Sequence, residues 1–242
     1  MPGADMVMST LMAREFLERL RAEGYGLKGL PPGMETLKGV SALAWRCARQ
    51  ADELADGLAR HAGLPLGSLD CRAGCSHCCR LAVTASPPEL LIVFQAIGDL
   101  PDAMSVASAI WNAAKRIAPL AGPDERLAAG VPCPLLGDNG RCMVYKARPI
   151  ACRTYFTRSE AACSAATEAS RRGAGGTLDH FGPGRIAGMV AVAGLTGTLA
   201  EAGLDPSPVD LTLGLAYLLD QGAERILAWA GGAPMFPGGR TE

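Results

Sequence analysis

The sequence predicts a mainly α-helical fold, interrupted by a short irregular β-hairpin or loop. Aromatic residues make up only 5% of the chain while Ala, Leu and Gly are abundant, a composition that favours packed helices over sheets. Several long segments place apolar residues at helical spacing. The third observation is a Gly-Asp-Asn-Gly turn at 137–140, followed by Arg-Cys-Met-Val-Tyr, which alternates like a short strand.

Composition restricts the possible functions. A chain of 242 residues with 49% hydrophobic residues can bury a substantial core, which argues against disorder. The formal net charge is −1, so electrostatics give no reason to expect binding to nucleic acid or to an anionic membrane.

The sequence also predicts a cytoplasmic location. The N-terminal residues include no basic segment followed by a sustained apolar run, so no secretory signal is predicted. The longest apolar run, 186–200, has only about 15 residues and a membrane span needs roughly 20, so a buried helix is expected there. In a reducing compartment, cysteine clusters hold metals more often than they form disulfides.

An N-terminal helical segment is expected over residues 1–66. Ser9 or Thr10 can cap a first helix, and a longer helix is predicted from about 35 to 61. Cys47 lies on the apolar stripe of this second helix, away from the other cysteines, and is expected to be a small buried core residue.

A cysteine-bearing region is expected over residues 67–170. Ser86-Pro87-Pro88-Glu89 is a strong helix start, and another helix is predicted at about 102–120, with 122–130 as loop. Pro149 is expected to open a helical turn carrying Cys152, Arg153 and Phe156, and a helix at 159–170 carries Cys163.

A C-terminal helical scaffold is expected over residues 171–242, packed on the same domain. Apolar helices are predicted near 185–202, 209–220 and 223–230.

The cysteines are the most informative residues in the chain. Four of the nine occur within 71–79, in the sequence Cys-Arg-Ala-Gly-Cys-Ser-His-Cys-Cys. If this stretch is helical, its sulfurs cover an arc of roughly 80–100° on one face. Thiolates are soft ligands suited to zinc and to iron–sulfur clusters. The candidate metal ligands are Cys71, Cys75, Cys78, Cys79, Cys133, Cys142, Cys152 and Cys163.

Eight thiols exceed the four that a tetrahedral zinc needs. Either a multi-metal site or one four-thiolate site with reserve thiols is therefore expected.

His77 lies inside the cluster and is either a ligand or an exposed residue beside it. Arg148 and Arg153 could offset the charge of thiolates, with an ordinary loop residue as the alternative for Arg148. Tyr145 and Tyr155 are expected to be packing residues.

The cysteine spacing resembles the YkgJ-type cysteine-cluster family. The resemblance rests on Cys-x₃-Cys-x₂-Cys-Cys at 71–79, on Cys-Pro-x-Leu at 133–136, on Gly-x-Cys-x-Val-Tyr at 140–145, and on Arg-Pro-x₂-Cys-Arg-x-Tyr at 148–155. It implies a zinc- or iron-chelating domain, in some descriptions one with an iron–sulfur cluster. It also implies that the chelating set is Cys71, Cys75, Cys78, Cys79, Cys133, Cys142 and Cys152.

The expected function is metal binding through cysteine thiolates, with zinc or iron, the latter including a [4Fe–4S] cluster, as the cofactor. The alternative is an iron- or Fe–S-dependent oxidoreductase or modifying enzyme, and the sequence identifies neither a substrate nor a protein partner. Cys-x₃-Cys-x₂-Cys at 71–78 also matches the radical-SAM spacing. That interpretation is disfavoured, because no β-rich run precedes Cys71 and no repeated strand–helix pattern is present.

Overall fold

The computed structural model describes residues 12, 15, 18, 36–173 and 180–236. The first helix predicted after Ser9 or Thr10 lies outside the described residues, apart from Met12, Glu15 and Glu18, which are helical.

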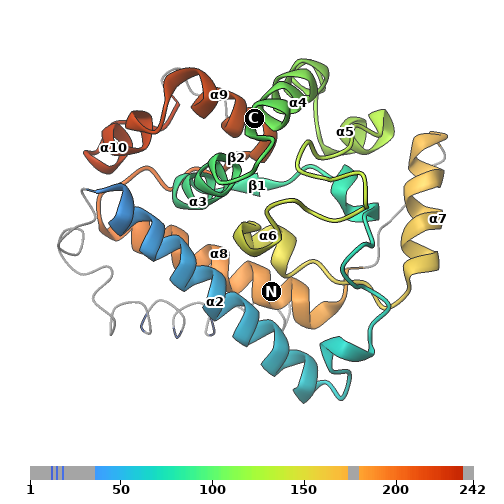
Figure 1. Cartoon of the computed structure of the whole chain (residues 1–242). Helices are drawn as coiled ribbons and strands as arrows, with labels where there is room; N and C mark the ends of the chain where they lie inside the picture. Colours follow the sequence, from blue (N-terminus) through green and yellow to red (C-terminus); the bar gives the residue numbers. More distant parts are fainter. Residues whose placement is uncertain (1–11, 13–14, 16–17, 19–35, 174–179, 237–242) are drawn as a thin grey trace.

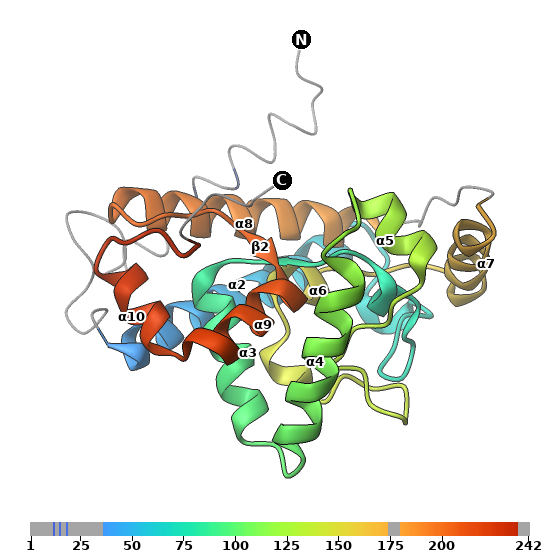
Figure 2. The same ribbon diagram turned by 90° about the horizontal axis from the view of Figure 1, so that it is seen from above.

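The protein is mostly helical, as predicted, and two long antiparallel helices form its base (Figure 1). Helix α2, Leu37–His61, is capped at its N-terminus by Thr36, whose side chain accepts a hydrogen bond of 3.1 Å from the Gly39 amide. It lies against α8, Gly182–Glu201, along much of its length (Figures 1 and 2). Both helices confirm segments predicted from apolar periodicity.

Shorter elements complete the fold above this pair. The 3₁₀ helices are η1 Leu66–Ser68, η2 His77–Arg80 and η3 Tyr145–Ala147. The α-helices are α3 Pro87–Gly98, α4 Ala103–Ile117, α5 Pro123–Ala129, α6 Ile150–Arg153, α7 Glu160–Arg171, α9 Leu211–Gln221 and α10 Glu224–Ala230.

A two-stranded antiparallel sheet joins the cysteine-bearing region to the C-terminal third. Strand β1, Thr84–Ala85, pairs with β2, Val209–Asp210, with Thr84 opposite Asp210. The helix predicted from 209 therefore begins only at Leu211. The Asp210 carboxylate accepts hydrogen bonds from the next turn's amides, at 2.8 Å from Thr212 and 3.0 Å from Leu213, and so caps the helix.

The prediction of a loop at 122–130 is wrong, because most of this segment is helix α5. Pro123 occupies its first turn, which also holds Asp124 and Glu125, and Gly130 ends it in the left-handed conformation with φ of 59°. These are helix-start and helix-stop features, and a helix of only seven residues has too few turns to show apolar periodicity.

The predicted hairpin forms, but it is shorter than expected. A single antiparallel bridge joins Leu136 to Cys142, closed by the Gly137 amide bonding to the Arg141 carbonyl at 2.9 Å. The predicted strand at 141–145 does not continue, because η3 begins at Tyr145 and the Ala147 amide bonds back to the Val144 carbonyl at 2.8 Å.

One hydrophobic core contains residues of α2, α3, α4, α8, α9 and α10. Cys47 belongs to it and is 0% exposed, which confirms its predicted place. No helix in the described part of the chain is long and apolar enough to cross a membrane.

Candidate metal centre

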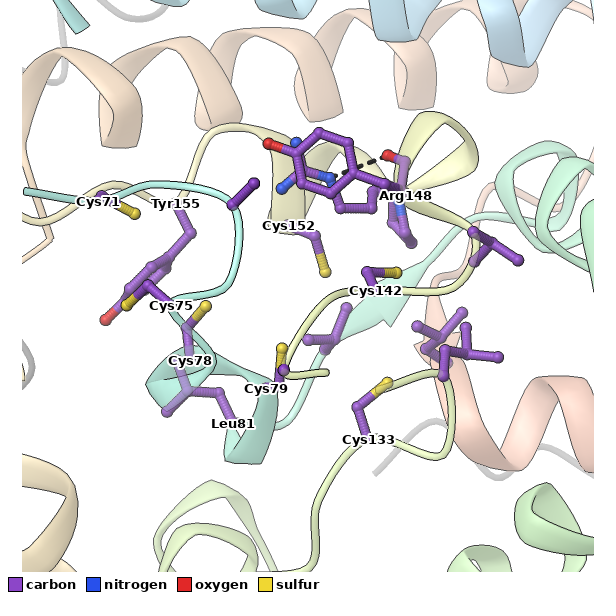
Figure 3. Close-up of a pocket in the computed structure, with 18 of the residues that line it drawn as sticks. Cys71, Cys75, Cys78, Cys79, Leu81, Cys133, Cys142, Arg148, Cys152 and Tyr155 are labelled. Carbon is purple, nitrogen blue, oxygen red and sulfur yellow. Dashed lines mark hydrogen bonds between the residues drawn. The ribbon is translucent and has the colours of Figure 1, made fainter. Parts of the chain in front are cut away.

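A cavity of about 110 Å³ lies where the cysteine-bearing segments meet, between η2, the 133–142 turn and α6 (Figure 3). Seven of the nine cysteines line it: Cys71, Cys75, Cys78, Cys79, Cys133, Cys142 and Cys152. The structure thus brings together thiols that are up to 81 positions apart in sequence.

The cavity has two sides that differ in their surroundings (Figure 3). Cys71 and Cys75 form what we call the outer wall, on a loop whose intervening residues 72–74 are exposed. Cys133, Cys142 and Cys152 form the inner wall, and the first two of them pack against the hydrophobic core. Cys78 and Cys79 lie between the two walls, on η2.

The helical arrangement considered for 71–79 is wrong. Residues 71–76 form a loop with turns, in which Gly74 has φ of 101°, and only His77–Arg80 is a 3₁₀ helix. The four sulfurs of this stretch therefore do not lie along one helix face. They reach the cavity because the loop wraps around it.

One backbone hydrogen bond and one close backbone contact tie the cysteine-bearing segments together. The Cys133 amide donates to the Cys79 carbonyl at 2.7 Å, which joins segments 54 positions apart. On the outer side, the left-handed Gly140 packs its backbone on the Gly74 carbonyl so closely that an added Cβ would lie only 3.1 Å from that oxygen.

A buried carboxylate positions Cys152. Glu89, in the first turn of α3, accepts hydrogen bonds from the Ser86 amide at 2.8 Å and, across the structure, from the Ile150 amide at 2.7 Å. The capping box that was predicted for α3 therefore also anchors the first turn of α6.

Arg153 anchors the same turn. Contrary to the prediction, it does not offset the charge of the thiolates. Its guanidinium pairs with the Asp52 carboxylate of α2 at 2.8 Å and donates to the Arg148 carbonyl at 2.7 Å. It also donates to the Lys146 carbonyl. These bonds tie α6 to α2 and to the backbone around η3, and Arg153 does not line the cavity, so it is a positioning residue.

Arg148 does line the cavity. It lies over the Tyr145 ring at 3.6 Å and donates to the Tyr145 carbonyl at 3.1 Å. Its positive charge acts to lower the pKa of Cys71, Cys78, Cys142 and Cys152, although burial outweighs it.

Tyr155 also lines the cavity and stacks on His180 at 4.4 Å, and His180 is held by the Thr154 carbonyl at 3.0 Å.

Burial of the inner-wall thiols favours their protonated, neutral form. Burial raises the pKa of Cys133 to about 11 and raises the pKa of Cys142 and Cys152 as well. The pKa of Cys78 is raised strongly by its hydrogen bond to Cys79 and then by burial. A metal ion in the cavity would stabilise the thiolates, and its binding would release protons.

Sequence reasoning missed Arg126, on α5. It lines the cavity beside Cys133, is only 5% exposed, and donates one hydrogen bond of 3.2 Å to the Val131 carbonyl. Its Nε has no hydrogen-bond partner among the described residues. A buried, incompletely paired guanidinium beside a set of thiols fits an anionic metal–thiolate centre. The start of α5 was the signal that could have indicated it.

Cys163 is placed differently from the other seven candidates. It lies on α7, is 3% exposed, and is not among the described residues that line the cavity. Burial first, and then the charges of Cys78, Cys75 and Cys71, raise its pKa to about 12. The helix α7 that carries it contacts η2.

No three of the cavity sulfurs lie within 4.8 Å of one another in the described part of the chain. Within the described residues, one trio of Cys, His, Asp or Glu ligand atoms lies within 4.8 Å of one another, and it consists of Cys75, His77 and Glu160. Four sulfurs bound to one zinc at about 2.3 Å would be about 3.8 Å apart. The cavity thiols are thus arranged more openly than a single tetrahedral zinc requires.

Comparison with known proteins identifies the cysteine-bearing region. Residues 70–169 match a family model named CxxCxxCC and described as a "putative zinc- or iron-chelating domain". No curated protein and no solved structure matched the chain. The matched range contains all eight candidate ligands and excludes Cys47, and it confirms the resemblance to the YkgJ-type family. Residues 70–169 of this chain are thus similar to the CxxCxxCC family of domains, and residues outside that range have no match.

Proposed function

We propose that the cavity binds a polynuclear metal–thiolate centre, and that this centre is an iron–sulfur cluster. One observation carries the proposal: seven thiols line one cavity, yet no three cysteine sulfurs among the described residues lie within 4.8 Å of one another. In such a cluster, inorganic sulfide occupies the space between the irons, so the protein sulfurs stay farther apart than around one zinc.

The cysteines of the inner wall, together with the two cysteines that lie between the walls, would hold the centre. Cys78, Cys79, Cys133, Cys142 and Cys152 come from three segments. The Cys133–Cys79 hydrogen bond joins the first two, and the Ile150–Glu89 hydrogen bond anchors the third to α3. When bound, the centre would supply one-electron chemistry or a structural cross-link.

The rest of the lining supports an anionic centre. Arg126 and Arg148 place two guanidinium groups at the cavity, where they can offset thiolate charge. Apolar side chains make up much of the remaining wall, and they exclude water from the sulfurs: Leu81, Val83, Leu135, Val144 and Leu211. An iron-dependent oxidoreductase or modifying activity stays a prediction of the sequence, as does the cytoplasmic location.

The test is elemental analysis of protein purified without oxygen. We expect iron and acid-labile sulfide in comparable amounts, with visible absorption that bleaches on exposure to air. Stoichiometric zinc in a colourless protein would contradict the cluster while leaving metal chelation intact. Protein that neither retains nor takes up zinc or iron would contradict chelation itself.

Two variants locate the metal. Cys78→Ser should lose metal and thermal stability together, because Cys78 lies between the two walls. Cys47→Ala is the matched control, since Cys47 is buried in the core and does not line the cavity. Equal metal loss in the two variants would contradict the assignment of the cavity as the metal centre.

A further inference from the structure

We propose that Cys75, His77 and Glu160 form a second metal site, which binds one divalent transition-metal ion at the mouth of the thiol cavity. Their ligand atoms are the trio that lies within 4.8 Å of one another in the described part of the chain. Neither His77 nor Glu160 lines the cavity, so this site is separate from the proposed cluster and shares only Cys75 with the cavity lining.

The side chains come from two elements that the fold holds face to face. Cys75 lies in the loop just before η2, His77 is the first residue of η2, and Glu160 is the first residue of α7. The two elements are in direct contact. Asp70 fixes the approach, because its carboxylate accepts a hydrogen bond of 3.2 Å from the Glu160 amide.

The Glu160 carboxylate is already oriented for a metal. Arg72 pairs with Oε2 at 2.9 Å, which leaves Oε1 facing the Nε2 of His77 at 3.9 Å. That separation is too long for a hydrogen bond. It is close to the roughly 3.3–3.5 Å between two ligands at 2.0–2.2 Å from a tetrahedral ion.

The donor set indicates the kind of ion. One thiolate, one imidazole and one carboxylate suit Zn²⁺, Fe²⁺ or Co²⁺ and are unsuited to Mg²⁺ or Ca²⁺, which prefer oxygen ligands. Three protein ligands leave a fourth position open to water or to another ligand.

The position of the site indicates its role. His77 and Glu160 line an open surface depression together with Asp70, Arg72 and Ser164, and their side chains are 29% and 35% exposed. Cys75 lies between this depression and the buried cavity that it also lines. An ion captured from solvent would thus contact one thiol of the outer wall of the cavity, and a role in loading the cavity rests on the proposed function.

The test uses the full-length protein as isolated without oxygen, titrated with Co²⁺. Wild type should take up one further equivalent, visible as thiolate-to-cobalt charge-transfer absorption, and Zn²⁺ should displace it. The double variant His77→Ala/Glu160→Gln should bind this equivalent at least tenfold more weakly. The matched control is His61→Ala/Glu168→Gln, which changes an exposed histidine on α2 and an exposed glutamate on α7.

The outcomes separate this site from the cluster. Loss of the Co²⁺ equivalent in the double variant, with the iron or zinc of the isolated protein retained, supports the second site. Identical Co²⁺ binding in wild type and double variant, or no uptake by wild type, overturns it even if the cavity is loaded. If the cavity holds no metal but Co²⁺ uptake still depends on His77 and Glu160, the second site stands and the cluster proposal fails. Unchanged melting temperatures would confirm that the variants are folded.

Discussion

The outer and inner walls of the cavity carry the same ligand type in opposite settings. Cys71 and Cys75 flank exposed residues on a loop, whereas Cys133 and Cys142 pack against the core and Cys152 follows the buried Ile150. The inner wall is tied to Glu89, Arg153 and the Cys79 carbonyl. The outer wall borders the surface depression with His77 and Glu160.

This difference indicates that the seven cavity thiols need not all have the same role in metal binding. Thiols on the inner wall are preorganised by the fold, so binding there costs little ordering entropy. Thiols on the outer loop can adjust and can reach incoming ions. We therefore expect substitutions on the two walls to have different consequences.

The largest expected difference is in metal retention. Cys152→Ser should weaken metal binding by at least about 100-fold, because even the loss of an outer-shell partner costs 10–100-fold. Cys71→Ser should weaken it by no more than about tenfold. Chelator competition followed by metal analysis measures both, with Cys47→Ala as a control in the hydrophobic core that does not line the cavity. Equal effects of Cys152→Ser and Cys71→Ser would remove the distinction between the walls.

The second expected difference is alkaline stability of the metal-free protein. Burial raises the pKa of Cys133 from 9.0 to about 11, so the folded state keeps a proton that the unfolded state releases. The free energy of unfolding should therefore be unaffected by this group below pH 9 and should fall by about 2–3 kcal/mol as the pH rises through 11.

Urea unfolding between pH 7 and about pH 11 checks this expectation. The free energy of unfolding of Cys133→Ser should fall less steeply than that of wild type over the alkaline range, because the serine has no proton to lose there. Parallel curves for the two proteins would show that Cys133 is not buried as described.

The smallest expected effect concerns Arg126. Arg126→Met should weaken metal binding about tenfold, since it removes a buried positive charge beside the inner wall. The metal-free protein should change little in its free energy of unfolding, because a buried charge with an unpaired Nε contributes little net stability.

Arg116→Met, an exposed change on α4, is the matched control for Arg126. Isothermal titration of the metal-free proteins compares their affinities. A loss of stability in metal-free Arg126→Met without any change in affinity would assign Arg126 a purely structural role.

Much of the helical framework could be predicted from the sequence. The Ser86–Glu89 capping box started α3 where it was expected, and the apolar stripe of α2 placed Cys47 in the core. These features depend on neighbours three or four positions apart, which a helix brings together by itself. The cysteine types and spacings likewise predicted the similarity of residues 70–169 to a zinc- or iron-chelating family model.

The tertiary structure alone decided how the ligands are arranged. The β1–β2 pair, the Cys133–Cys79 bond and the Ile150–Glu89 bond join residues from 54 to 126 positions apart, which no local pattern encodes. The same is true of Arg126 beside Cys133 and of Glu160 beside His77. The sequence by itself determined which chemistry is available, because side-chain type sets ligand softness. Only packing between distant segments decided which thiols share a cavity, because the short elements that carry them are stabilised by tertiary contacts rather than by their own propensities.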